Sequence, residues 1–101
     1  MKSMAEELKT FVADIIKRLV DNPDQVKVEC VVSTKSVILQ IDADTTDYGK
    51  IIGKQGRTID SLKTLAAAIK NTKFDKDSRK IYLEVLEDEK NNISKFRKDH
   101  I

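Results

Sequence analysis

The chain has 101 residues, of which 40% are hydrophobic and 36% are charged, and its formal net charge is +2. A chain of this length is expected to form one domain, because folding buries about two-thirds of its surface in one modest core. No apolar run approaches the ~20 residues of a membrane span, and no signal-peptide pattern follows Met1. We therefore expect a soluble cytoplasmic protein that does not enter a membrane.

The chain has one cysteine and one histidine, so few side chains could serve as catalytic groups or metal ligands. Cys30 lies in the alternating run VKVECVV, so we expect a buried strand thiol rather than a reactive or metal-binding one. His100 stands next to the C-terminus, and a His/Cys metal site therefore has no set of ligands. We expect neither an enzyme nor a bound metal or cofactor, because these two residues offer no nucleophile–base pair.

The first predicted element is a helix. Ser3 and Glu6 have the spacing of a capping box, and apolar residues then recur at three- and four-residue intervals. The helix should end between Val20 and Asn22, because Pro23 disfavours a helical residue before it. The residues of its apolar face are Leu8, Phe11, Val12, Ile15, Ile16 and Leu19.

Two strands are predicted next. Alternating β-branched residues run from Val26 to Val32 and again from Val37 to Ile41, with the polar turn Ser33-Thr34-Lys35 between them. A turn this short indicates an antiparallel hairpin. Asp44-Thr45-Thr46 then offers N-cap side chains to a short helix from Asp47 to Ile52, which Gly53 ends.

A second helix is predicted to begin at about Gly56. Its apolar face consists of Ile59, Leu62, Leu65, Ala66 and Ile69. We expect residues 71–80 to form a polar connection and Ile81 to Val85 to form the third strand. The order is αββααβ, which predicts an α+β domain over residues 1–86. Residues 87–101 are highly charged and form a helical or frayed tail, with Ile93 and Phe96 on one helical face.

Charge is distributed unevenly along the chain. Residues 49–80 carry nine basic and three acidic side chains, a net charge of +6, so the remaining segments sum to −4. A basic middle between acidic ends suits a localised polyanion-binding face, although such runs are also common on solvated helix surfaces. The basic residues are Lys50, Lys54, Arg57, Lys63, Lys70, Lys73, Lys76, Arg79 and Lys80.

The stretch IIGKQGRTI, residues 51–59, lies between the short helix and the one that follows. Gly53 and Gly56 can adopt positive φ and leave the backbone accessible to a ligand's own backbone. The N-terminus of the second helix favours phosphate oxygens, and Lys54, Gln55 and Arg57 add donors. Ile51, Ile52 and Ile59 offer apolar side chains beside the turn. This combination predicts a groove for a single nucleic-acid strand.

At these residues the chain resembles a known family. IIGKQGRTI is similar to the KH-domain signature, whose GXXG loop clamps about four nucleotides of backbone. The order αββααβ resembles the type II, bacterial arrangement of that fold. RLVDNPDQVKVE and DYGKIIGKQGRTIDSLKTLAAA also resemble the small stand-alone bacterial KH proteins of the KhpA type. The resemblance covers about residues 4–86.

The resemblance implies a non-catalytic, single-stranded RNA-binding protein that acts as an RNA chaperone or post-transcriptional regulator. It also implies a homodimer, or a pair with a larger KH-containing protein. The implied RNA-binding residues are Lys50, Ile51, Ile52, Gly53, Lys54, Gln55, Gly56, Arg57 and Ile59.

Two questions stay open at the level of sequence. The chain could instead be a dimerising or partner-docking protein in which RNA binding is secondary, because the helix with Leu62 and Leu65 carries more apolar positions than one small core needs. Phe74, in the polar connection, could stack on a base at the rim of the groove or tuck onto its own domain.

Overall fold

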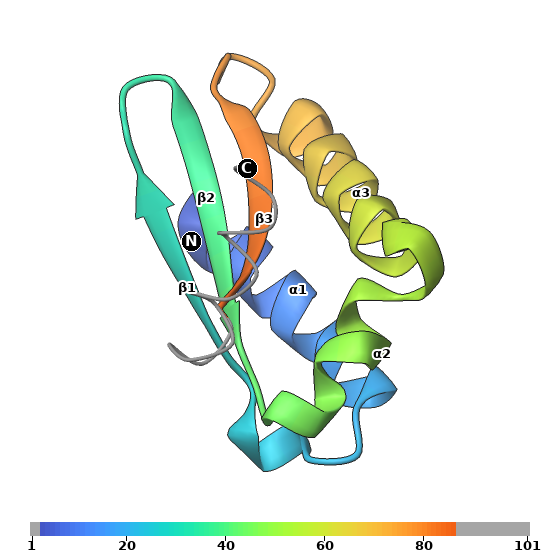
Figure 1. The fold of residues 1–101 in the computed structure, drawn as a ribbon. Coiled ribbons are helices and arrows are strands. Elements are labelled where there is room, and N and C mark those ends of the chain that lie inside the picture. The colour runs from blue at the N-terminus through green and yellow to red at the C-terminus, as the bar shows by residue number, and fades with distance from the viewer. Residues whose placement is uncertain (1–2, 87–101) are drawn as a thin grey trace, which may run out of the picture.

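The computed structural model describes residues 3–86, whose helices and strands follow the predicted order (Figure 1). The domain is α+β, with a three-stranded sheet and three α-helices, and this confirms the predicted fold class. The predicted tail, residues 87–101, lies outside the described residues. The elements are α1 (Met4–Leu19), β1 (Lys27–Val32), β2 (Ser36–Asp42), α2 (Tyr48–Ile52), α3 (Arg57–Lys73) and β3 (Lys80–Leu86), with short 3-10 turns at Pro23–Gln25, Thr45–Asp47 and Lys54–Gly56.

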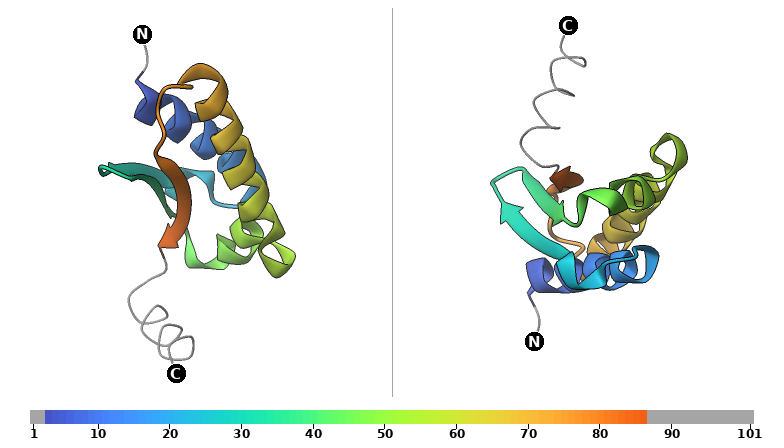
Figure 2. Two further views of the ribbon diagram at one scale, coloured as in Figure 1. Left: turned by 90° about the horizontal axis from the view of Figure 1, so that it is seen from above. Right: turned by 60° about the horizontal axis from the view of Figure 1, so that its bottom comes forward.

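The sheet has the strand order β1-β2-β3. β1 and β2 form the predicted antiparallel hairpin, with Cys30 opposite Leu39, whereas β3 pairs parallel to β2, with Leu83 opposite Leu39. Helices α1 and α3 cover one face of the sheet, where α1 packs on β1 and α3 on β3 (Figure 2). The inward side chains of central β2 are therefore fully buried: Val37, Leu39 and Ile41.

Helix α1 forms as its sequence predicts, except that Leu19 of the predicted apolar face is 40% exposed. Ser3 caps it, because the Ser3 Oγ accepts a hydrogen bond from the backbone N–H of Glu6 at 3.2 Å. The helix ends at Leu19, before Pro23. Every fourth residue faces the core, since one helical turn takes 3.6 residues. The buried residues of α1 are Met4, Leu8, Val12 and Ile16.

The end of α3 differs from the prediction. Residues 71–73 were expected in a polar connection, but the helix continues to Lys73 and the connection to β3 spans only residues 74–79. No glycine or proline interrupts this stretch, and polar residues are compatible with an exposed last turn. Tertiary contacts hold the turn, because the Lys73 Nζ lies 2.6 Å from Glu7 Oε1 on α1.

Two further predictions, for Cys30 and for Phe74, can be compared with the structure. Cys30 is half-buried rather than fully buried, and burial raises the pKa of its thiol above the ordinary value. Phe74 packs against the core, so the structure favours the tucked position over the rim of a groove. Within residues 3–86, none of the helices has the length and apolar content needed to cross a membrane.

Candidate nucleic-acid interface

The turn between α2 and α3 depends on glycine at its first position. Gly53 ends α2, and its φ of 78° lies where residues with a side chain are strained. A Cβ at Gly53 would stand 2.2 Å from Thr58 Oγ1 and 2.8 Å from the Thr58 backbone nitrogen. The start of α3 therefore packs directly on the bare backbone of Gly53.

The rest of the turn presents backbone to solvent. Gln55 (φ 57°, ψ 27°) and Gly56 (φ 74°, ψ 13°) are both left-handed, and the chain returns to right-handed helix at Arg57. Within the turn, the Gly56 N–H donates to the backbone oxygen of Gly53 at 3.1 Å, and the Arg57 N–H donates to the backbone oxygen of Lys54. Gly56 is the N-cap of α3 and has no side chain to cap its first N–H groups, so the positive end of this 17-residue helix faces the turn.

The structure brings most of the predicted site residues together around this turn. Lys54, Gln55 and Arg57 are exposed. Ile52 and Ile59 are half-buried, one before the turn and one after it. Seven of the nine predicted residues thus lie at the turn or directly beside it in the chain, and none of the seven is fully buried.

Two of the predicted residues face elsewhere. Ile51 is fully buried in the core at 0% exposure, where it anchors α2 instead of lining a surface. The Lys50 Nζ lies 3.0 Å from Asp21 Oδ2 in the connection between α1 and β1. This hydrogen bond to Asp21 raises the pKa of Lys50 and places its ammonium beside the acidic connection.

A buried carboxylate holds the start of α2. Asp47 is the N-cap residue of α2 and is 0% exposed. It accepts hydrogen bonds from the backbone N–H groups of Asp21 and Asn22, at 3.1 and 3.0 Å, and from the Asn22 side-chain amide at 3.1 Å. Burial by itself raises the pKa of Asp47, but these hydrogen bonds and the charge of Lys50 outweigh it and leave the pKa below the ordinary value.

Tyr48 also holds α2 in place, through a hydrogen bond to β3. Its hydroxyl donates to the backbone oxygen of Leu86, at the end of β3, at 2.6 Å. The α1–β1 connection and the last residue of β3 thus both hold α2, and α2 leads directly into the glycine turn. Neither Asp47 nor Tyr48 was predicted as a site residue. The only sequence signal was Asp47's place at the expected start of the short helix.

A family model for the KH domain of KhpA/KhpB proteins matches residues 9–85. The chain is 40% identical over 81 residues to the RNA-binding protein KhpA of Chlamydia caviae. The aligned region covers 80% of this chain and 99% of that protein. It is 39% identical over 80 residues to the RNA-binding protein KhpA of Aquifex aeolicus. The aligned region covers 79% of this chain and 96% of that protein.

The fold is also similar to part of Era. A structure of Era bound to MgGDPNP and nucleotides 1506–1542 of 16S ribosomal RNA matches with a TM-score of 0.64 at 17% identity. The match covers 83% of this chain and 30% of that one. Era of Aquifex aeolicus bound to GDP and AlF4⁻ matches with a TM-score of 0.65 at 16% identity, over 84% of this chain and 31% of that one. On its sequence and its fold together, the chain belongs to the KhpA/KhpB family of KH domains.

Proposed function

We propose that this chain is a non-catalytic protein that binds single-stranded RNA, with residues 1–86 as its KH domain. The turn from Gly53 to Gly56 clamps the sugar-phosphate backbone, and the adjacent apolar wall holds about four bases. One observation carries this proposal above all. Gly53 and Gly56 have positive φ, and α3 begins immediately after them, so bare backbone and the positive end of a helix meet at one exposed turn.

The residues of the turn take different parts. Lys54 and Arg57 attract the phosphates, Gln55 donates from the tip, and the backbone at Gly53 and Gly56 lets the strand approach closely. The half-buried Ile52 and Ile59 give the bases an apolar surface. Lys50 is paired with Asp21 and Ile51 is buried in the core, so both act by positioning α2 rather than by touching the strand.

The cellular role follows from this mode of binding. A clamp on the backbone of about four nucleotides selects single strands more than sequences, as an RNA chaperone or post-transcriptional regulator requires. We place this activity in the cytoplasm. The relatives from Chlamydia caviae and Aquifex aeolicus are named RNA-binding proteins, which supports the RNA class of ligand.

Self-association is the second part of the proposal. Leu62 and Ala66 of α3 are buried in the core, but Leu65 is 51% exposed and Leu19 of α1 is 40% exposed. Both leucines border one hollow that also reaches Arg57, at the start of α3. We propose that this apolar surface meets a second copy of the chain or a larger KH-containing protein.

The decisive experiment reverses the charge of the turn. Lys54→Asp combined with Gln55→Asp should lower the affinity for a short single-stranded RNA at least tenfold. Two carboxylates would then face phosphates at close range, where like charges repel by about 1 kcal/mol in water and by more where water is excluded. Circular dichroism and melting should be nearly unchanged, because both side chains are exposed.

A matched control makes the same change in charge elsewhere. Lys9 and Gln25 are both exposed, on α1 and on the α1–β1 connection. Lys9→Asp with Gln25→Asp should leave binding close to wild type. If the variant of the turn folds and binds RNA with native affinity, the clamp is wrong and the partner-docking alternative becomes the better account.

A further inference from the structure

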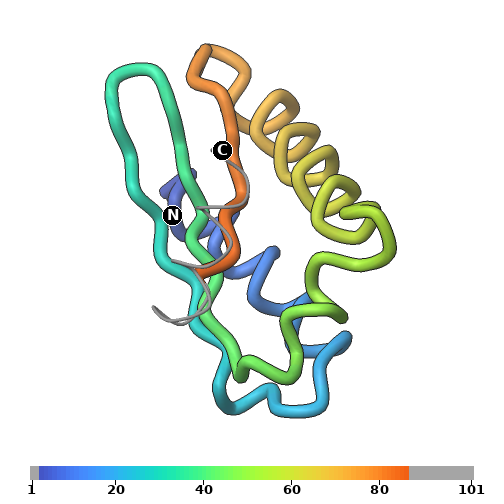
Figure 3. Tube along the Cα trace, in the orientation of Figure 1, coloured from blue at the N-terminus to red at the C-terminus, as the bar shows by residue number. Residues whose placement is uncertain are grey.

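The sheet has an outer face that the helices of residues 3–86 leave uncovered. Helices α1 and α3 pack on the opposite face, and α1 passes behind the strands in Figure 3. Side chains along β2 alternate between the two faces, and the three that point toward the helices are fully buried. The three that point to the outer face are Ile38, Gln40 and Asp42.

One row of side chains across the outer face is apolar. Val31 and Tyr82 are the partners of Ile38 on the neighbouring strands, and paired side chains lie about 5 Å apart on the same face. Val31 is 46% exposed, Tyr82 is 43% exposed and Ile38 is half-buried. The outward face of a sheet usually carries polar side chains, and an exposed apolar cluster marks a contact surface. These three residues, here called the apolar row, therefore call for an occupant.

The rest of the outer face is mostly negative. Next to the apolar row lies an acidic row, in which Gln40 stands between Glu29 and Glu84. The Gln40 Nε2 donates to Glu84 Oε1 at 3.4 Å, and within residues 3–86 neither glutamate forms an ion pair. The row beyond it adds Lys27 and Asp42, so the two rows carry three acidic side chains and one basic side chain. This part of the face attracts a cationic occupant.

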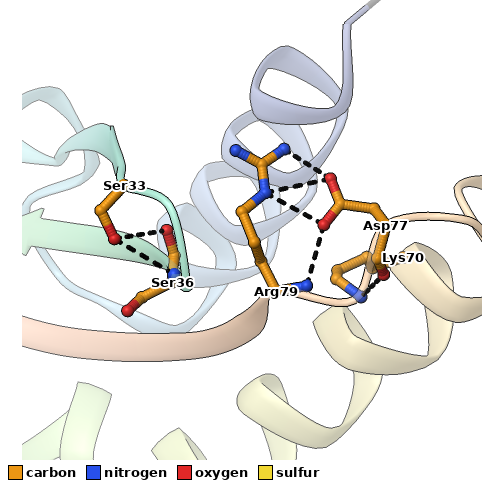
Figure 4. A network of polar contacts seen from close by, with 5 residues as sticks. All are labelled: Ser33, Ser36, Lys70, Asp77 and Arg79. Atoms are coloured by element: carbon orange, nitrogen blue, oxygen red, sulfur yellow. Dashed lines mark hydrogen bonds and ion pairs between the residues drawn. The ribbon is translucent and has the colours of Figure 1, made fainter.

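Polar contacts hold the end of the sheet beside the apolar row (Figure 4). The Oγ of Ser33 accepts a hydrogen bond across the β1–β2 turn at 3.1 Å. Just before β3, the Arg79 Nε donates to both carboxylate oxygens of Asp77, at 3.0 and 3.1 Å. The backbone N–H of Lys80 joins these two segments, because it donates to the backbone oxygen of Lys35 at 3.1 Å. The apolar row is therefore preformed, which lowers the entropic cost of binding an occupant.

The tail, residues 87–101, follows directly from this face. It begins after Leu86, which ends β3 and is the partner of Asp42 on the outer face. The apolar row lies four strand residues back from Leu86, about 13 Å away. The tail has 15 residues, which span about 22 Å even as a continuous helix. A tail that turns back over the outer face can therefore reach the apolar row.

The sequence of the tail complements the face. Ile93 and Phe96 fall on one helical face, and Lys90 and Arg97 fall beside them, three and four residues from Ile93. Residues 90–101 carry four basic side chains and one acidic side chain, with His100 neutral. The apolar pair thus suits the apolar row, and the excess of cations suits the acidic row.

We propose that residues 87–101 turn back and bind the outer face of their own sheet. Ile93 and Phe96 cover the apolar row. Lys90 and Arg97 pair with the carboxylates of the acidic row. Attachment at the end of β3 keeps the tail at a high effective concentration beside the face, which favours it over a free partner. The inference does not rest on the proposed function, because none of its residues belongs to the glycine turn.

The first test uses a fluorescent reporter in the tail. The chain contains no tryptophan, so Phe96→Trp in the full chain introduces a single one. Its emission should be shifted to the blue relative to Lys95→Trp, which places the reporter one residue away and off the apolar helical face. Adding Val31→Gln and Ile38→Gln to the Phe96→Trp chain should remove this difference. Circular dichroism checks that each variant keeps its helices and strands.

The second test measures what the tail adds to stability. Ile93→Ser combined with Phe96→Ser should lower the melting temperature by about 4 to 8 °C, because the apolar row is then left exposed. Asn91→Ser combined with Lys95→Ser changes the opposite side of the same helical pattern and should melt like wild type.

A charge swap tests the pairing with the acidic row. In the Phe96→Trp chain, Glu29→Lys combined with Glu84→Lys should shift the emission to the red, because like charges then face each other. Adding Lys90→Glu and Arg97→Glu should restore the blue emission. A swap that restores nothing would overturn the charge pairing.

The remaining outcomes decide whether the tail is the occupant. Emission of Phe96→Trp equal to that of Lys95→Trp would overturn the inference, and so would serine variants of Ile93 and Phe96 that melt like wild type. Blue emission that is constant from low to high micromolar protein supports binding within one chain. Blue emission that appears only at high concentration would assign the outer face to a second copy and overturn the inference.

Discussion

The carboxylate of Asp47 accepts hydrogen bonds from both the backbone N–H and the side-chain amide of Asn22, at 3.0 and 3.1 Å. The two residues are 25 positions apart in the sequence. Their contact joins the connection after α1 to the N-cap residue of α2, and α2 ends at Ile52, immediately before the glycine turn. The position of the glycine turn therefore depends on a part-buried polar contact at the opposite end of α2.

Removing the Asp47 carboxylate should destabilise the domain. Asp47→Ala leaves two backbone N–H groups of the α1–β1 connection without their acceptor, and the melting temperature should fall by about 5 to 15 °C. Asp24→Ala, at an exposed position of the same connection, is the control and should melt within a few degrees of wild type. Equal melting of Asp47→Ala and wild type would show that the contact adds nothing to stability.

The same carboxylate predicts loss of stability in acid. The pKa of Asp47 is lower in the folded protein than its ordinary value of 3.8. The unfolded chain therefore binds the proton first, so this contribution to stability is present above about pH 4 and is lost as the pH falls through the folded pKa. Melting curves from pH 7 to pH 2.5 should show a steeper decline for wild type than for Asp47→Asn. Parallel declines would contradict this assignment.

The glycines of the short helix and the turn should differ sharply in their tolerance of alanine. Gly53→Ala places a Cβ against Thr58 at positive φ and should cost at least about 2 kcal/mol of the free energy of unfolding. Gly49→Ala, within α2, meets no atom within 4 Å and should be neutral or stabilising by up to about 1 kcal/mol. Urea denaturation measures both. A Gly53→Ala protein as stable as wild type would mean that the turn can adopt another conformation.

RNA binding should favour single strands and depend modestly on salt. An apolar wall of Ile52 and Ile59 needs unstacked bases, so a duplex of equal length should bind more weakly. Contacts to about two to four phosphates give a slope of log affinity against log salt on the order of −1.5 to −3. Titrations at several salt concentrations measure it. Equal affinity for duplex and single strand, or a much steeper slope, would indicate a nonspecific basic patch.

Self-association should depend on Leu65. Light scattering at high micromolar concentration should detect wild-type dimers, and Leu65→Gln should shift the protein to monomer without lowering its melting temperature, because this side chain is half exposed. Val32→Gln, at a similarly exposed apolar position on β1, is the control that should still dimerise. Wild-type protein that stays monomeric in the absence of any partner would argue against this surface.

Sequence patterns determined the elements and the location of the turn, because those features depend on local spacing. The period of Leu8, Val12 and Ile16 shows which face of α1 is buried. Alternation in β1 and β2 with a three-residue turn determines their antiparallel pairing. Glycines three apart between two helices imply positive φ, since few other residues adopt it without strain.

Contacts between distant segments decided the rest. The spacing on α3 does not distinguish Leu62, which is buried, from Leu65, which is exposed, because the edge of the core depends on where α1 packs. The sequence predicted Asp47 only as a cap of the short helix. In the structure it also accepts hydrogen bonds from two backbone N–H groups and one side-chain amide of the α1–β1 connection. The parallel pairing of β3 with β2 brings Tyr82 within reach of Lys63, and such a meeting of distant residues leaves no periodic signal in the sequence.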